Sequence, residues 1–156
     1  MVKASTSELV PFDQDFHAWV LEQIELLKGG RFADLDIEHL VDELRAVAMA
    51  EESEIDNRLV VLLHHLLKWE FQPQRRSNSW RATILEQRKR INRVISKSPS
   101  LRRYPAIAIA EEYDIARLRA SGETGLPLER FPSTCPYSAA KALDENFLPS
   151  EAQIEE

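Results

Sequence analysis

The chain of 156 residues has little of several residue types that mark particular folds or reactions. It holds four glycines, against about 11 at average usage, which argues against a glycine-rich phosphate loop and a turn-rich all-β fold. Its one cysteine, Cys135, excludes an internal disulfide and is typical of a reducing cytosol. The patterns G-x-S-x-G, H-E-x-x-H and C-x-x-C do not occur, so the enzymes that they mark are not indicated.

Long apolar runs are absent too. The longest, residues 59–67, is interrupted by His64 and His65, and it falls far short of the ~20 residues that a transmembrane helix needs. Residues 1–11 contain one lysine and no apolar run of seven, which does not fit a secretory signal. We therefore expect a cytoplasmic protein that does not interact with membranes.

What the chain does contain fits one soluble helical domain. Apolar residues make up 44% and charged residues 29% of an 18.0 kDa chain, a size typical of a single domain. Because apolar side chains recur at helical spacing, we predict an all-α fold: an irregular bundle of four main helices plus a short C-terminal helix. The domain is expected over residues 13–149, with loose ends at 1–12 and 150–156.

The first helix is expected over residues 13–28. Asp13 or Asp15 can cap its start, because a short carboxylate accepts hydrogen bonds from the free N–H groups there. Gly29-Gly30 can end it, since glycine tolerates the left-handed conformation. One apolar stripe follows its length: Phe16, Trp19, Val20, Ile24 and Leu27.

The second helix is expected over residues 37–69, which is long for a small domain. Its apolar stripe fails at residues 50–54, Ala-Glu-Glu-Ser-Glu. A straight helix of this length would measure ~50 Å, against a domain diameter of about 40 Å. A bend near 50–54, a protruding end and one continuous helix are all compatible with the sequence, since no glycine or proline forces a break there.

Prolines and small polar residues divide the second half of the chain. Pro73 ends the long helix, and Ser98-Pro99 is typical of the start of a fourth helix, with proline at the first helical position. Between them a third helix is expected, and its N-cap is one of three neighbouring residues, Ser77, Asn78 or Ser79.

The fourth helix is expected to run to about Ala120. Pro105 should split off its first turn, and Gly122 and Gly125 should end it. Residues 126–136 contain three prolines and are expected to form an extended loop. A short last helix follows over residues 138–145.

Charge is distributed unevenly in a chain whose net charge is −6. Residues 13–56 hold 13 acidic and 3 basic side chains, a net −10, whereas residues 68–103 hold 11 basic and 2 acidic ones, a net +9. Either the two segments pack together and neutralise each other, or one positive face stays open to an acidic partner or to phosphate.

The third helix carries the basic residues most suited to binding. Its periodicity places Arg81, Arg88 and Lys89 beside the apolar stripe and Arg90, Arg93 and Lys97 on the outer face. Trp69 and Trp80 flank two further arginines; such aromatics can stack on arginine or on bases, or can join two helices. The candidate partner-binding residues are Arg75, Arg76, Arg81, Arg90, Arg93 and Lys97.

The sequence gives little support for a catalytic or metal-binding site. His64 and His65 point ~100° apart on a helix, so a metal would need one of them with His17 or His39 from another segment. Glu51, Glu52 and Glu54 occupy the gap in the apolar stripe, where burial would raise their pKa values. Cys135 has no partner base that the sequence identifies. No cofactor is indicated.

Short motifs are spread along nearly the whole chain. They are residues 15–19 (DFHAW), 30–36 (GRFADLD), 66–69 (LLKW), 72–73 (QP), 75–84 (RRSNSWRATI), 86–88 (EQR), 123–127 (ETGLP), 135–137 (CPY), 143–144 (LD) and 147–149 (FLP). Together these motifs resemble those of the bacterial domain-of-unknown-function family twenty-nine over about residues 13–149, and His17 departs from the Tyr usual there. The resemblance implies a small, mostly helical bacterial protein with one domain, and brings no established activity, cofactor or catalytic residue.

The function that the sequence favours is a non-enzymatic interaction module that presents a basic helix to an acidic protein partner. One alternative is weak DNA or RNA binding through the same surface, with a homodimer as one form that it can take. A third is a hydrolytic or metal-dependent enzyme built on the carboxylates of residues 51–54 with His64 or His65.

Overall fold

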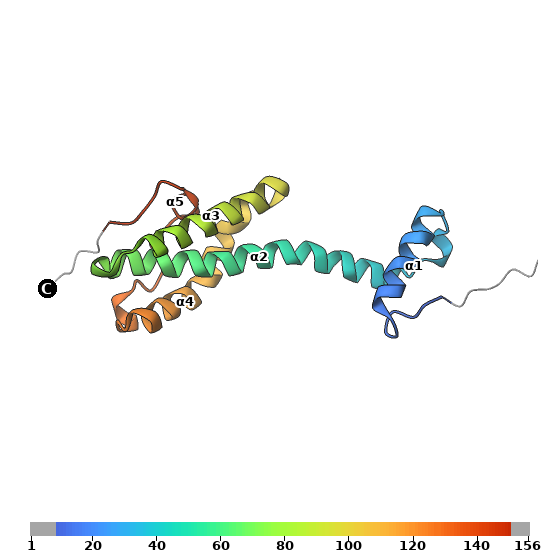
Figure 1. The fold of residues 1–156 in the computed structure, drawn as a ribbon, viewed down its shortest axis with the longest axis horizontal. Helices are drawn as coiled ribbons and strands as arrows, with labels where there is room; N and C mark the ends of the chain where they lie inside the picture. Colours follow the sequence, from blue (N-terminus) through green and yellow to red (C-terminus); the bar gives the residue numbers. More distant parts are fainter. Residues whose placement is uncertain (1–8, 151–156) are drawn as a thin grey trace, which may run out of the picture. The chain divides into compact units, whose positions relative to one another are not determined.

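The computed structural model describes residues 9–150, and these form five α-helices and no β-strand (Figure 1). The predicted all-α fold of four main helices and a short last one is confirmed. Four short 3₁₀ segments, η1 to η4, join the helices. In chain order the elements are α1 (Phe16–Lys28), η1 (Phe32–Asp34), α2 (Ile37–Phe71), η2 (Pro73–Arg75), α3 (Asn78–Lys97), η3 (Pro99–Arg103), α4 (Tyr104–Thr124), η4 (Leu128–Arg130) and α5 (Ala139–Leu143).

The chain divides into two compact units between Ala48 and Met49. This point lies inside α2, which is helical from Ile37 to Phe71, including residues 50–54. The α-helix is therefore continuous through residues 50–54, which is one of the three possibilities that the sequence left open. A single domain over residues 13–149 stays a prediction.

The first unit is a pair of helices, α1 and the start of α2, joined through η1. Asp15 caps α1 by accepting a hydrogen bond from the Ala18 amide, and the chain turns at Gly30 with a φ of 69°. Trp19 is the buried centre of this unit, and its indole Nε1 donates to the carboxylate of Asp36 at 3.2 Å.

The second unit contains the main apolar core. The last five turns of α2 contribute leucines to it, and α3, α4 and α5 pack around them (Figure 1). Burial of these side chains stabilises the unit by roughly 25 cal/mol for each Å² of apolar surface removed from water. The side chains less than 2% exposed include Ile55, Leu59, Leu62, Leu63, Leu66, Leu67, Ile84, Ile91, Ala108, Ala116 and Phe131.

The predicted boundaries of α2 and α5 agree with the structure to within two residues, and the start of α3 is one of those predicted. The long helix ends at Phe71, two positions before Pro73, and Ser77 is the residue that caps α3. Ser138 caps α5 through the Lys141 amide. These positions depend on local chemistry alone, which explains why sequence patterns locate them well.

The fourth helix starts as predicted, with a separate first turn that opens at Ser98-Pro99, but it runs past its predicted end near Ala120. Pro99 starts a 3₁₀ turn, and the α-helix begins at Tyr104, with Pro105 in its first turn. Gly122 lies inside α4 and does not end it. The helix runs to Thr124 and ends at Gly125, whose φ of 72° is left-handed, a conformation that costs glycine little.

The ends of the chain were predicted to be loose over 1–12 and 150–156. Residues 1–8 and 151–156 lie outside the described residues. Phe12 is described: its ring stacks on His39 at 4.2 Å and meets Trp19 edge-on at 4.9 Å. The amide of Val10 donates a hydrogen bond to the carboxylate of Glu22. Residues 10 and 12 are therefore held against α1 and α2 within the first unit.

Candidate functional site

The predicted basic surface lies on α3 and on the turn before it. Arg75, Arg81, Arg90, Arg93 and Lys97 are exposed, whereas Arg76 is partly buried. The Ser77 cap fixes the start of α3 and so the direction in which these side chains leave the helix. The structure therefore keeps five of the six predicted residues accessible to a partner.

Two of these cations already have acidic neighbours. Arg90 pairs with Glu86 of the same helix at 2.8 Å, and the 80%-exposed Lys97 side chain lies 3.4 Å from Glu51 of α2. Arg75, Arg81 and Arg93 make no ion pair with any residue of the described range. Neutralisation by the acidic segment is thus partial, and pairs exposed in this way are worth less than about 1 kcal/mol.

A shallow groove of about 400 Å³ follows this surface. Six side chains spaced by three or four residues line it, so they share one face of α3. Ala82 and Leu85 form its apolar part, and Lys89, which was not among the predicted residues, stands beside Arg93. The lining is Ala82, Leu85, Glu86, Lys89, Arg90 and Arg93.

Two arginines of the basic segment point inward. Arg76 donates from Nε to the backbone oxygen of Trp69 at 2.8 Å, and its guanidinium lies over the Trp69 ring. Arg88, expected beside the apolar stripe, is 1% exposed and donates from Nε to the backbone oxygen of Ala142 at 2.7 Å. Both arginines join segments of the second unit.

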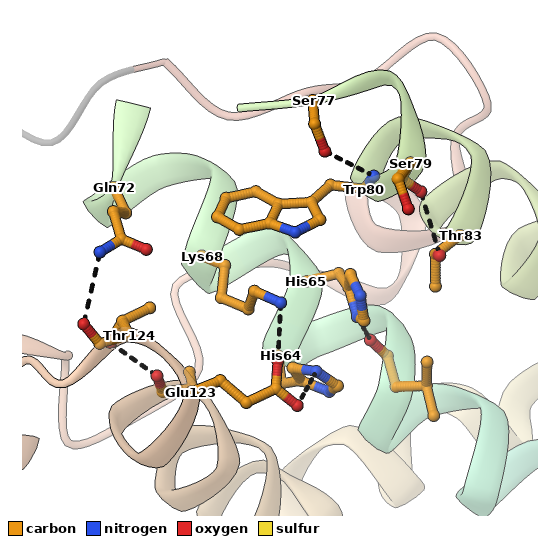
Figure 2. A network of polar contacts seen from close by, with 12 residues as sticks. His64, His65, Lys68, Gln72, Ser77, Ser79, Trp80, Thr83, Glu123 and Thr124 are labelled. Atoms are coloured by element: carbon orange, nitrogen blue, oxygen red, sulfur yellow. Dashed lines mark hydrogen bonds and ion pairs between the residues drawn. The ribbon is translucent and has the colours of Figure 1, made fainter. Parts of the chain in front are cut away.

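A polar network connects α2, α3 and α4 (Figure 2). The carboxylate of Glu123 lies 2.6 Å from Nζ of Lys68 and 3.3 Å from Nε2 of His64. The ammonium of Lys68 also lies 4.4 Å from the centre of the Trp80 ring, a cation–π contact. Nearby, the side-chain amide of Gln72 donates to the backbone oxygen of Thr124.

The two histidines of this network are neutral at pH 7. The Nδ1 atoms of His64 and His65 lie 3.3 and 2.8 Å from the backbone oxygens of Val60 and Val61. Burial, with a smaller contribution from the charge of His65, lowers the pKa of His64 from 6.5 to about 4. Burial also lowers the pKa of His65.

Glu123 is ionised in the same network. Burial raises its pKa, but the hydrogen bond and charge of Lys68 outweigh that effect and leave the pKa below its ordinary value. The ionised Lys68–Glu123 pair connects α2 to α4.

The carboxylates of the hydrolytic alternative are not assembled with the histidines. Glu51 accepts a hydrogen bond from Ser98 at 2.6 Å, which lowers its pKa, the opposite of the expected rise. Glu54 pairs with Arg58 at 2.8 Å. Residues 54 and 64 lie on one helix, ~15 Å apart along its axis, so these groups cannot act on one substrate atom.

Cys135 lines a cavity of about 380 Å³ with Tyr113 and Tyr137. Burial raises the pKa of the Cys135 thiol, which keeps it protonated and weakly nucleophilic. Tyr137 donates to the carboxylate of Glu70, and Tyr113 donates to the backbone oxygen of Pro132 at 2.7 Å. The tyrosines thus anchor the loop that carries Cys135.

The part of the chain that the structure describes contains neither a cluster of metal ligands nor a helix that could span a membrane. Within residues 9–150 no three His, Cys, Asp or Glu side chains are grouped so that they could hold a metal ion. In the same range no helix has the length and apolar character needed to cross a membrane.

Comparison with known proteins places the chain in a family. No curated protein and no solved structure matches it. The family described as "Domain of unknown function DUF29" matches residues 12–148, which are nearly the range over which the resemblance was seen in the sequence. The match covers most of the chain, and the protein therefore belongs to the DUF29 family.

Proposed function

We propose that the chain is a non-enzymatic interaction module that binds an acidic protein segment along the outer face of α3. The observation that carries the proposal is the groove between Leu85, Lys89 and Arg93. Lys89 and Arg93 are exposed and make no ion pair with a residue of the range 9–150. Their charges are therefore available to carboxylates of a partner.

The apolar part of the groove favours a protein segment over a nucleic acid. Leu85 is 37% exposed between the cations, and an apolar partner side chain would cover it. A phosphate backbone makes no use of the apolar Leu85 side chain. Weak binding of DNA or RNA through this surface is the second candidate, supported by the exposed cations Arg75 of η2 and Arg81 in the first turn of α3.

The test is a selection of binding peptides from a random library displayed against the full chain. We expect enriched peptides to contain Asp or Glu at spacings of three or four residues with one apolar residue between them. The double variant Lys89→Glu, Arg93→Glu should bind these peptides at least about tenfold more weakly. Binding of a 20-base-pair DNA at about 50 mM salt tests the second candidate.

A matched control separates this surface from general charge effects. The double variant Arg119→Glu, Arg130→Glu makes the same charge change at exposed positions of α4 and η4, and it should keep the affinity. Equal losses in both variants, or a library that yields no acidic peptides, would contradict the proposal. Sedimentation of the Lys89→Glu, Arg93→Glu variant shows whether the acidic partner is a second copy of this chain.

A further inference from the structure

The first unit carries an apolar groove that is separate from the α3 surface. It measures about 150 Å³ and lies between α1 and the start of α2. The side chains on α1 are spaced by three or four residues, as are those on α2, so each helix turns one face toward the groove. The residues that carry the argument are Phe16, Val20, Ile24, Leu27, Leu44 and Val47.

These side chains are far more exposed than a helix interface allows. Phe16 is 49%, Leu44 68% and Val47 66% exposed. Ile24 and Leu27 are 43% and 46% exposed beside them. Scattered apolar residues on a surface need no explanation, but a continuous apolar groove marks a site for a partner.

The first unit that carries the groove is acidic, and its negative charge is only partly compensated within the unit. Residues 9–48 contain nine acidic and three basic side chains, a net −6. Each of the three cations, Lys28, Arg31 and Arg45, already pairs with an acidic residue three positions away in the chain. Glu43 lines the groove itself and forms no ion pair with a described residue.

We infer that this groove binds an amphipathic helix of another protein, with an apolar stripe in the groove and Lys or Arg on both flanks. Insertion of a helix between two helices is a common mode of peptide recognition, and the uncompensated acidic charge selects a cationic partner. The groove is too small for a typical ligand pocket of about 300–1,000 Å³.

A second copy of the chain fits the groove less well. Two copies that pair through this groove would bring together two first units, each with a net charge of −6, and these charges repel each other. The basic helix α3 of another copy exposes one large apolar side chain, Leu85, among the residues described, and one side chain does not make a stripe. The exposed apolar residues of α4 are accompanied by two exposed carboxylates, Glu111 and Asp114, and by one exposed cation, Arg119, so this helix lacks the cationic flanks that the acidic first unit favours.

The experiment measures binding of labelled 18-residue peptides to the full chain by fluorescence anisotropy. One peptide has a leucine stripe at helical spacing with Lys on its flanks, and the second has the same stripe with Glu on its flanks. A third has the composition of the first in scrambled order. We expect the Lys-flanked helix to bind about tenfold or more tightly than either of the others.

Variants locate the binding. Leu44→Glu should weaken binding of the Lys-flanked helix about tenfold or more, whereas Leu118→Glu should change it less than about twofold; Leu118 of α4 is 64% exposed and is the matched control. Glu43→Lys should reduce the preference for Lys flanks. The Lys89→Glu, Arg93→Glu variant should bind this peptide like the wild type, so the test is independent of the α3 proposal.

Three results would overturn the inference. The first is equal affinity for Lys-flanked and Glu-flanked helices. The second is no peptide binding by a chain that sediments as a dimer and becomes monomeric in Leu44→Glu, which would assign the groove to a second copy. The third is no peptide binding by a monomeric chain, which would mean that the groove is closed within its own molecule.

Discussion

The Nζ atom of Lys68 lies 2.6 Å from Oε2 of Glu123, across 55 positions of sequence. The Lys68 side chain is 8% exposed and that of Glu123 is 49% exposed, so one partner is buried and the other reaches solvent. Removal of the accessible partner would leave a buried ammonium with a cation–π contact to Trp80 as its remaining compensation. Such a charge is costly.

Glu123→Ala should therefore lower the free energy of unfolding by about 1–3 kcal/mol. The control is Glu111→Ala, which removes an exposed carboxylate from the same helix and should change stability by less than about 0.5 kcal/mol. Urea unfolding followed by circular dichroism measures both. If the two variants are equally stable, the Lys68–Glu123 pair does not hold α4 against α2.

The folded chain should lose stability as the pH falls below 6.5, because His64 is buried in its neutral form. Burial lowers the folded-state pKa of His64 to about 4, below its ordinary 6.5, so between these values the unfolded chain binds more protons than the folded one. Stability from this group is complete above pH 6.5 and is lost as the pH falls toward 4. For a side chain as buried as His64, the loss amounts to roughly 3 kcal/mol.

The variant His64→Gln should flatten the dependence of stability on pH between 6.5 and 4. His65 retains part of the slope, because burial lowers its pKa too. His39 acts in the opposite sense, since its hydrogen bond to Asp36 raises its pKa and adds stability at low pH. A wild-type chain equally stable at pH 7 and pH 5 would contradict the assignment.

A buried guanidinium connects α3 to α5, whose apolar residues also pack on the main core. Arg88→Ala removes the hydrogen bond to Ala142 and leaves a cavity in the second unit, and should cost about 2–4 kcal/mol. Because α5 then opens more often, trypsin should cut after Lys141 faster than in the wild type. Lys89→Ala, the exposed neighbour, is the control and should leave this cleavage rate unchanged.

Helix positions could be predicted because their signals are local. The cap at Ser77, the break at Pro73 and the turn at Gly30 act within four residues of the element that they bound. The burial of Arg88 could not be predicted from residue type, although positions 84 and 91 place it on the inward face. Its hydrogen-bond partner, the backbone oxygen of Ala142, is 54 positions away in the sequence, and no local pattern predicts this contact.

The apolar stripe of the first helix shows a second limit of sequence patterns. Periodicity identifies Phe16, Ile24 and Leu27 as one face, and this face does exist, but all three are exposed while Trp19 is buried. A stripe specifies that a helix is amphipathic; it does not specify what covers it. The groove on the first unit was therefore missed, as was the contribution of Lys89 to the groove on α3.

Two glycines near the end of α4 should respond to alanine with opposite signs. Gly125 has a φ of 72°, which strains any residue with a Cβ, so Gly125→Ala should destabilise the second unit by about 1 kcal/mol. Gly122 is inside the helix with no atom near the place of a Cβ, so Gly122→Ala should stabilise it by about 0.5–1 kcal/mol. Thermal unfolding of both variants compares them in one background. Because one changes the cap and the other the helix interior, a gain at residue 125 or a loss at residue 122 would mean that α4 ends earlier, near Ala120.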